Sequence, residues 1–337
     1  MTNAAAHDWR TCTVVESRPV STRARRITLE RPVASGRPAE PGTHIDMRIP
    51  LPDKGSDNTS DVRSYSIVES DDLGKHLTVT VQRAANSRGG SAYLHGLRVG
   101  DTIGATRPLQ DFPLSFGADG YLLLAGGIGV TALVSVARAL RRHGAPYRIV
   151  YAGRSRDDMA YLDLLREEHG ERLTTFVDDE GSQLDAAALV AEVAAQSGRQ
   201  ELVMCGPVRL MDAVRRAWSA AELSPVDLRF ETFGNSGWYD AEPFEVELPE
   251  QGITATVAAD QTMLDALVEA GADLMWDCRK GECGLCAMAV NDLVGELDPR
   301  DVFFSERQQL AADRACMCVA RVAAGGAGSG RVSVRTL

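Results

Sequence analysis

The sequence lacks a run of about 18 apolar residues, so we expect no membrane-spanning helix. The opening segment Met1–Arg10 also lacks the apolar core of a signal peptide, and a cytoplasmic location is therefore expected. Positive charge is in deficit, since 36 Lys and Arg face 47 Asp and Glu, giving a net charge of −11. This balance argues against nucleic acid or an anionic membrane surface as the main partner.

Acidic charge and cysteine are both concentrated towards the end of the chain. From Asp240 to Leu337 there are 17 Asp and Glu but only 8 Lys and Arg, a net charge of −9, which leaves −2 for all other residues. Five of the seven cysteines lie in the last 60 residues: Cys278, Cys283, Cys286, Cys316 and Cys318. A disulfide framework would be spread more evenly, so this clustering predicts a metal site.

Three segments differ in their hydrophobic pattern, and a chain of 337 residues is long enough for more than one domain. Residues 1–115 contain short strands separated by turn signals, which predicts a small antiparallel barrel or sandwich. Residues 116–233 alternate strand with helix, which predicts a parallel, doubly wound α/β sheet. Residues 234–337 begin with a linker at 234–243 and continue with two strands, a helix, the cysteine-rich loop and a final strand.

The cysteine-rich loop has the spacing Cys-x4-Cys-x2-Cys over Cys278, Cys283 and Cys286. With one distant cysteine, this spacing is typical of a plant-type [2Fe–2S] cluster, and either Cys316 or Cys318 is available as the fourth ligand. Gly281 and Gly284 allow the backbone to wrap closely around the sulfur atoms. A zinc site is the alternative, but zinc sites usually pair two Cys-x2-Cys units, and only one is present.

Two strand ends in the middle segment carry small residues. Gly126, Gly127 and Gly129 follow a buried strand, and Thr131 begins the next helix, so a pyrophosphate can approach the backbone there. Cys205-Gly206-Pro207 ends a later strand of the same sheet. Ligands of such sheets bind at the carboxyl ends of the strands, so the two motifs together predict a dinucleotide site.

In combination, these motifs resemble the ferredoxin–NADP reductase superfamily. The resemblance implies that Cys205 lies where the nicotinamide meets a flavin, and that Arg154 and Ser155 contact the adenosine ribose. Arg154 also suits a 2′-phosphate, so NADPH is an alternative cofactor. The acidic pair Asp178 and Asp179 at the end of the following strand disfavours an extra phosphate, and NADH is therefore expected.

The same superfamily carries the flavin signature Arg-x-Tyr-Ser, which Arg63-Ser64-Tyr65-Ser66 matches. The match implies that Arg63 pairs with phosphate, that Tyr65 lies beside the isoalloxazine ring, and that Ser66 hydrogen-bonds near the flavin N5. Ser66 and Cys205 are thus the two candidates for the reaction centre. The remaining residues expected to contact the flavin are Ser64, Thr80, Gly89, Gly90, Ser91 and Phe233.

Ser87-Arg88-Gly89-Gly90-Ser91 precedes an expected short helix, where backbone N–H groups and the Ser91 hydroxyl suit a terminal phosphate. No adenosine-binding insertion is evident, so FMN is expected rather than FAD. The segment around Phe230–Phe233 closes the nucleotide domain, and family resemblance implies that Phe233 covers the flavin.

The order of flavin, nucleotide and [2Fe–2S] signatures resembles the phthalate dioxygenase reductase and vanillate demethylase reductase family along nearly the whole chain. It implies an antiparallel β-barrel FMN domain, an α/β NAD domain and a plant-type ferredoxin (β-grasp) domain. It also favours Cys318 as the fourth ligand, because Cys318-Val-Ala-Arg321 resembles the ligand-bearing Cys-x-Ser-Arg segment. Two departures are expected near the cluster, a longer loop at 291–295 and a glycine-rich loop at 323–330.

The resemblance implies that electrons pass from NADH through FMN to the cluster and then to a partner. We expect a Rieske-type terminal oxygenase that docks at the acidic ferredoxin domain, and the main alternative is a cytochrome P450. A redox-sensing regulator is the non-enzyme alternative, but no residues remain for a DNA-binding or effector module. A cofactor-free, decayed reductase is the third, and it would have lost some of the motifs.

Overall fold

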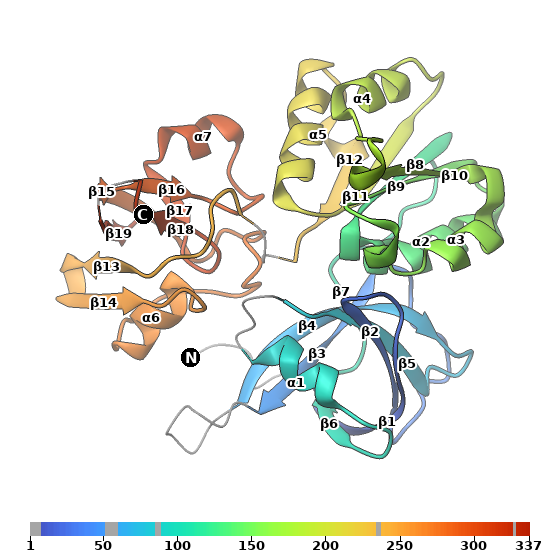
Figure 1. Cartoon of the computed structure of the whole chain (residues 1–337), viewed down its shortest axis with the longest axis horizontal. Helices are drawn as coiled ribbons and strands as arrows, with labels where there is room; N and C mark the ends of the chain where they lie inside the picture. The colour runs from blue at the N-terminus through green and yellow to red at the C-terminus, as the bar shows by residue number, and fades with distance from the viewer. Residues whose placement is uncertain (1–7, 51–59, 85–88, 234–236, 326–327) are drawn as a thin grey trace. The chain divides into compact units, whose positions relative to one another are not determined.

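The computed structural model describes residues 8–50, 60–84, 89–233, 237–325 and 328–337 (Figure 1). The chain divides into two compact units, of which the first ends at Glu231 and the second begins at Thr232, while Pro207–Asp212 groups with the second. The three main sheets fall one in each predicted domain, and the exact domain boundaries remain predictions. Among the described residues, no helix has the length and apolar character needed to cross a bilayer.

The first sheet is a closed antiparallel barrel whose ring runs β4-β5-β2-β1-β6-β3 and back to β4, with β7 added beside β3. The elements are β1 (Arg10–Pro19), β2 (Ala24–Glu30), β3 (Thr43–Pro50), β4 (Ser60–Ser70), β5 (His76–Gln82), α1 (Gly90–Gly96), β6 (Thr102–Ala105) and β7 (Leu109–Gln110). Inward side chains such as Ile27, Ile45 and Val79 are fully buried, so closure of the ring fills the interior with aliphatic groups.

The second sheet is parallel throughout, in the order β10-β9-β8-β11-β12. Its strands are β8 (Gly120–Gly126), β9 (Tyr147–Gly153), β10 (Leu173–Val177), β11 (Gln200–Cys205) and β12 (Leu228–Glu231). Its α-helices are α2 (Val130–His143), α3 (Leu162–His169), α4 (Ala186–Ala194) and α5 (Val208–Ala220). The strand order reverses between β8 and β11, which is where such sheets bind their ligands. This doubly wound arrangement is the one predicted from the sequence.

The barrel and the parallel sheet share one apolar core in the first unit. Val68 of β4 and Phe112, which follows β7, are buried in the same cluster as Leu133 and Ala137 of α2. The backbone N–H of Gly42 in the barrel also donates to the Ser135 hydroxyl of α2 at 3.4 Å. Strand β4 and helix α2 therefore pack directly against each other.

The second unit contains a mixed sheet in the order β14-β13-β19-β15-β17 and a two-stranded ribbon, β16-β18. Its elements are β13 (Phe244–Leu248), β14 (Ile253–Val257), α6 (Met263–Glu269), β15 (Ala287–Val294), β16 (Glu296–Asp298), α7 (Glu306–Ala311), β17 (Arg314–Cys316), β18 (Arg321–Ala323) and β19 (Gly330–Thr336). Helix α6 covers buried side chains of β13 and β14, including Phe244 and Val246, which gives the predicted β-grasp form.

The expected long loop at 291–295 is wrong, because Asn291–Val294 belongs to strand β15. A shift of register between Val290 and Asp292 marks a β-bulge, which absorbs an extra residue without opening a loop. Gly295 then turns the chain at a φ of 109°. In the glycine-rich segment at 323–330, residues 326–327 lie outside the described part, as do residues 234–236 of the linker.

Candidate functional site

The loop that carries three of the predicted cluster ligands connects α6 to β15, and its backbone N–H groups point at sulfur. The N–H groups of Lys280, Glu282 and Cys283 each donate to the Cys278 Sγ atom at 3.4 Å. Such bonds stabilise negative charge on a thiolate ligand. The loop is therefore preorganised to hold Cys278 in the form that binds iron.

Two glycines give this loop its tight path. Gly281 and Gly284 both have a φ of 74°, in the left-handed region that favours glycine. A Cβ on Gly281 would lie 2.7 Å from Val319 Cγ2, and one on Gly284 would lie 2.3 Å from the Phe303 ring. The loop thus packs against the segments at 301–304 and 318–319, which brings the distant cysteines close to it.

The thiols of the five clustered cysteines interact with one another. A hydrogen bond from the Cys318 thiol, helped by the three backbone N–H groups, lowers the pKa of Cys278 to about 5. Hydrogen bonds from Cys316 and then Cys318 lower the pKa of Cys286 to about 3. Burial is the leading cause that raises the pKa of Cys283. The Cys318 thiol thus contacts the thiols of Cys278 and Cys286, which are the two ends of the loop motif, whereas the Cys316 thiol contacts that of Cys286.

These residues fit a [2Fe–2S] cluster, in which each iron takes two thiolates. Within the described ranges, no three His, Cys, Asp or Glu side chains converge on a point suited to one metal ion. The Cys-x4-Cys-x2-Cys loop and one distant cysteine supply the four thiolates that a plant-type two-iron cluster needs.

The two nucleotide motifs meet at the switch point between β8 and β11. Gly126 ends β8, Gly127 has a φ of 51°, and Gly129 packs against the end of β11. A Cβ on Gly129 would lie 2.1 Å from the Cys205 carbonyl oxygen and 2.8 Å from the Gly206 nitrogen. Only glycine at position 129 lets the turn after β8 approach the end of β11 this closely.

The other nucleotide residues lie along the same edge of the sheet. Thr131 is buried and its hydroxyl donates to the Ile128 carbonyl at 2.9 Å, which stabilises the start of α2. Cys205 is buried at the end of β11, and the carbonyl of Pro207 accepts N–H groups from the first turn of α5.

Arg154 and Ser155 follow β9 and stand next to an acidic turn. The Arg154 carbonyl accepts the N–H of Asp179 at 3.0 Å, and Asp178, Asp179 and Glu180 form one short 3-10 turn. Glu180 pairs with the Arg156 guanidinium, with a hydrogen bond of 2.6 Å, and this bond is the leading cause that lowers the pKa of Glu180. The predicted ribose end of the site is therefore rich in carboxylates.

The flavin signature lies on β4, paired with β3. Ser64 donates to the Asp46 carboxylate at 2.6 Å, and Tyr65 and Ser66 stand opposite Ile45 and His44. The Arg63 side chain lies against the start of α1, because a Cβ on Gly90 would be 3.4 Å from Arg63 Cγ.

The phosphate turn beside Arg63 is partly described. Gly89 has a φ of 88°, and the Ser91 hydroxyl accepts the Ala84 N–H at 3.2 Å. Ser87 and Arg88 lie outside the described residues. Arg63 and this turn form a cationic and N–H-rich corner that fits a phosphate.

One site residue was missed by the sequence reasoning. Ser66 donates to the Glu231 carboxylate at 3.3 Å, and both side chains are buried. Glu231 ends β12, two residues before Phe233, and a lone carboxylate between the aromatic residues Phe230 and Phe233 was the available signal.

Two further residues were predicted to contact the flavin, and like the other predicted contacts they remain predictions. The Thr80 hydroxyl is bonded to the Tyr161 hydroxyl, and Phe233 is partly exposed where the chain leaves β12.

Comparisons with known proteins identify two domain families in this chain. Residues 123–216 match the family "Oxidoreductase NAD-binding domain", and residues 246–323 match "2Fe-2S iron-sulfur cluster binding domain". The chain is 34% identical over 307 residues to the putative toluene-4-sulfonate monooxygenase system reductase subunit TsaB2 of Comamonas testosteroni, covering 89% of this chain and 92% of that protein.

Solved structures show the same architecture. Phthalate dioxygenase reductase superposes with a TM-score of 0.70 at 25% identity, covering 97% of this chain and 98% of that one. An intact type IV self-sufficient cytochrome P450 monooxygenase gives a TM-score of 0.63 at 33% identity, covering 97% of this chain. This chain spans only 41% of that longer protein.

The fold and the matches define a pyridine-nucleotide-dependent oxidoreductase with a flavin-type barrel and an iron–sulfur domain. The chain belongs to the family of reductase components of oxygenase systems that includes phthalate dioxygenase reductase. FMN, NADH and a [2Fe–2S] cluster, the cofactors expected from the sequence, are those of this family.

Proposed function

We propose that the protein takes a hydride from NADH onto FMN and delivers single electrons, through the cluster held by Cys278, Cys283, Cys286 and Cys318, to a Rieske-type terminal oxygenase. When bound, the flavin converts the two-electron donation of NADH into one-electron steps, and the cluster carries one electron at a time. The observation that carries the proposal is that this one chain matches an NAD-binding family and a 2Fe-2S family and superposes on phthalate dioxygenase reductase along nearly its whole length.

The predicted flavin and nucleotide residues have distinct roles in this proposal. Arg63 and the turn at 89–91 hold the flavin phosphate, while Tyr65 positions the ring. Ser66 hydrogen-bonds near the flavin N5, and the buried carboxylate of Glu231 fixes the orientation of its hydroxyl. Cys205 orients the nicotinamide at the end of β11, and the turn at 126–129 holds the pyrophosphate with Thr131, Gly206 and Pro207.

NADH is the proposed donor because of the acidic turn after β10. A 2′-phosphate near Arg154 and Ser155 would approach Asp178, Asp179 and Glu180, whose like charge opposes it. The guanidinium that faces Glu180 belongs to Arg156 and is already paired. A site with three carboxylates therefore suits the ribose hydroxyl groups of NADH better than the phosphate of NADPH.

The proposed partner docks at the acidic ferredoxin domain, whose net charge of −9 attracts a basic surface. A Rieske-type oxygenase is favoured because this chain matches phthalate dioxygenase reductase over the whole length of both proteins. A cytochrome P450 is the second candidate, because the self-sufficient P450 contains a region similar to this chain. A cytoplasmic location is also proposed, since a thiolate cluster site suits a reducing compartment.

The electron route is tested by comparing two acceptors in steady state. Ferricyanide takes electrons from the flavin, whereas cytochrome c, a basic protein, draws them through the cluster. We expect Cys318→Ser to reduce cytochrome c at least 10-fold more slowly than the wild type while its ferricyanide rate stays within about 2-fold. Equal loss of both activities, or undiminished cytochrome c reduction, would contradict the proposed order of cofactors.

A further inference from the structure

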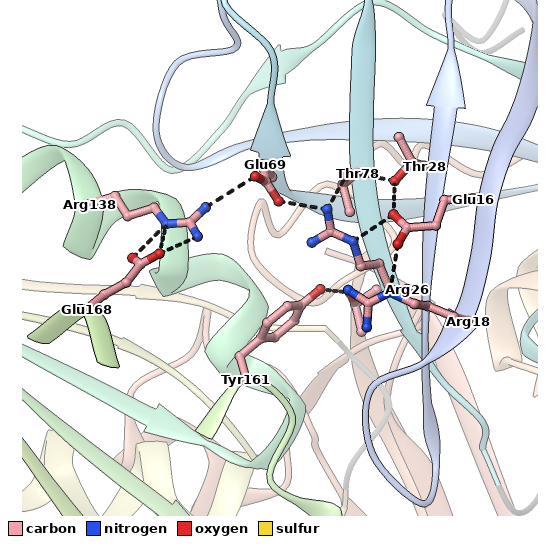
Figure 2. A network of polar contacts seen from close by, with 10 residues as sticks. Glu16, Arg18, Arg26, Thr28, Glu69, Thr78, Arg138, Tyr161 and Glu168 are labelled. Atoms are coloured by element: carbon pink, nitrogen blue, oxygen red, sulfur yellow. Dashed lines mark hydrogen bonds and ion pairs between the residues drawn. The ribbon is translucent and has the colours of Figure 1, made fainter. Parts of the chain in front are cut away.

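A chain of charged side chains of alternating sign runs from the barrel into the nucleotide domain (Figure 2). Along this charged chain the order is Arg18, Glu16, Arg26, Glu69, Arg138 and Glu168. The first four belong to barrel strands, and the last two belong to α2 and α3. None of these residues contributes to the cofactor sites described above, so the charged chain needs a separate explanation.

At the barrel end, Arg26 is held on two sides. Its Nε donates to Glu16 at 2.9 Å and its Nη2 to Glu69 at 2.7 Å, and the Arg26 side chain is only 14% exposed. Burial alone would raise the pKa of Glu16, but hydrogen bonds from Arg26, Arg18 and Thr28 lower it to about 2. The Arg26 guanidinium is therefore fixed in position, and it fixes the carboxylate of Glu69.

At the other end, Arg138 is held by Glu168. The Arg138 Nε and Nη2 atoms donate to the two Glu168 oxygens at 2.8 and 2.6 Å, a bidentate pair. Its Nη1 atom lies 3.9 Å from the Glu69 carboxylate. Glu69 thus stands between two guanidinium groups from two domains, and without its charge those groups would repel each other across the domain boundary.

A second polar contact crosses the same boundary. The hydroxyl of Tyr161, which directly precedes α3, bonds to the hydroxyl of Thr80 on β5. Tyr161 also hydrogen-bonds to Arg26, although burial is the leading influence on its pKa, which it raises. The charged chain and the Tyr161–Thr80 contact therefore join at Arg26, on the barrel side.

The Glu69–Arg138 contact lies near the residues proposed to bind the flavin and near those proposed to bind the nucleotide. Glu69 follows Ser66 by three residues on the same strand, β4, and Arg138 lies on α2, which starts next to the pyrophosphate turn at Gly129. The pairing of β4 with β5 shifts register between Ile67 and Glu69, but the backbone of β4 is continuous there and the strand packs against α2. A change at the Glu69–Arg138 contact is therefore expected to shift β4 relative to α2 and the nucleotide turn before it.

We infer that Glu69 and Arg138 are positioning residues for hydride transfer, setting the distance and angle between the nicotinamide and the flavin. This inference rests on the proposed function. Reaction rates are steeply sensitive to such geometry, since a misplacement of about 1 Å costs on the order of 100-fold. A partial shift caused by the loss of one charge should lower the rate of hydride transfer about 10-fold.

The test is anaerobic stopped-flow reduction of the bound flavin by NADH, with the limiting rate expressed per bound flavin. Glu69→Gln should lower that rate about 10-fold and leave the NADH concentration at half-saturation within about 2-fold, because the nucleotide contacts are intact. Glu69→Asp keeps the charge and should recover part of the rate. The matched control is Glu192→Gln, which removes the partner of Arg148 in an exposed ion pair of the nucleotide domain.

The outcomes separate this inference from the proposed function. A merely structural role would lower the flavin content and the melting temperature of Glu69→Gln without changing the rate per bound flavin, and that result overturns the inference. An equal loss in Glu192→Gln overturns it as well. Absence of flavin reduction by NADH in the wild type would overturn the proposed function itself.

Discussion

The approach of Gly129 to the end of β11 gives a prediction whose magnitude follows from the structure. In Gly129→Ala the new Cβ would lie 2.1 Å from the Cys205 carbonyl oxygen, 2.4 Å from its carbonyl carbon and 2.8 Å from the Gly206 nitrogen. All three neighbours are backbone atoms at the end of a fully paired strand, so no side chain can rotate away. The strand end and the glycine turn must therefore separate by about 1 Å to restore normal contact.

Overpacking of this kind costs about 1–3 kcal/mol. For a unit of this size, about 1 kcal/mol corresponds to 2–4 °C, so we expect a melting temperature lower by about 2–12 °C. The same separation moves the pyrophosphate turn away from Cys205, and flavin reduction by NADH should slow by roughly 100-fold. Differential scanning calorimetry and anaerobic stopped-flow absorbance measure the two effects.

Gly96→Ala is the matched control, because a Cβ at that position in α1 meets nothing within 4 Å. It should keep the wild-type melting temperature and rate. If Gly129→Ala matched this control in both measurements, the close contact between the two nucleotide motifs would be refuted, and with it the assignment of the turn as the pyrophosphate site.

Three further predictions concern single site residues. Cys318→Ser should lose the cluster while Cys316→Ser keeps it, and equal iron and sulfide content in the two variants would contradict the ligand assignment. Arg63→Ala should retain less FMN through gel filtration, since it removes the phosphate cation, and unchanged flavin occupancy would count against that contact. Cys205→Ala should slow flavin reduction by NADH but leave the spectrum of the oxidised flavin unchanged; a normal stopped-flow trace would show that Cys205 lies away from the nicotinamide.

The sequence predicted the three sheets because their strands have strong local signals. Examples are the buried strand that ends at Gly126 and the strand that contains Ile27 and Leu29, which the structure shows as β8 and β2. Local pattern fails after the cysteine loop. Residues 315–323 are all buried, so their sequence shows neither the two-residue alternation of a half-exposed strand nor the 3.6-residue period of a helix. Strand β18 and most of β17 lie in this segment and were not predicted.

The tertiary contacts of Glu231 and Arg321 escaped prediction because they join segments that are distant in the sequence. Glu231 meets Ser66 across 165 residues, and no spacing rule connects them. Arg321 was noted only as part of a motif, yet its guanidinium binds the carbonyls of Gln261, Glu242 and Ala258. Motifs indicate which residues bear the chemistry, whereas such tertiary hydrogen bonds can be found only from the fold.

The most direct test of the proposed electron route is an anaerobic titration of the purified protein with NADH, followed by absorbance and low-temperature EPR. The proposal predicts bleaching of the flavin absorbance accompanied by a rhombic EPR signal from a reduced [2Fe–2S] cluster. Flavin bleaching without that signal would contradict the assignment of the cysteine loop, and the protein would then be a simpler flavin reductase.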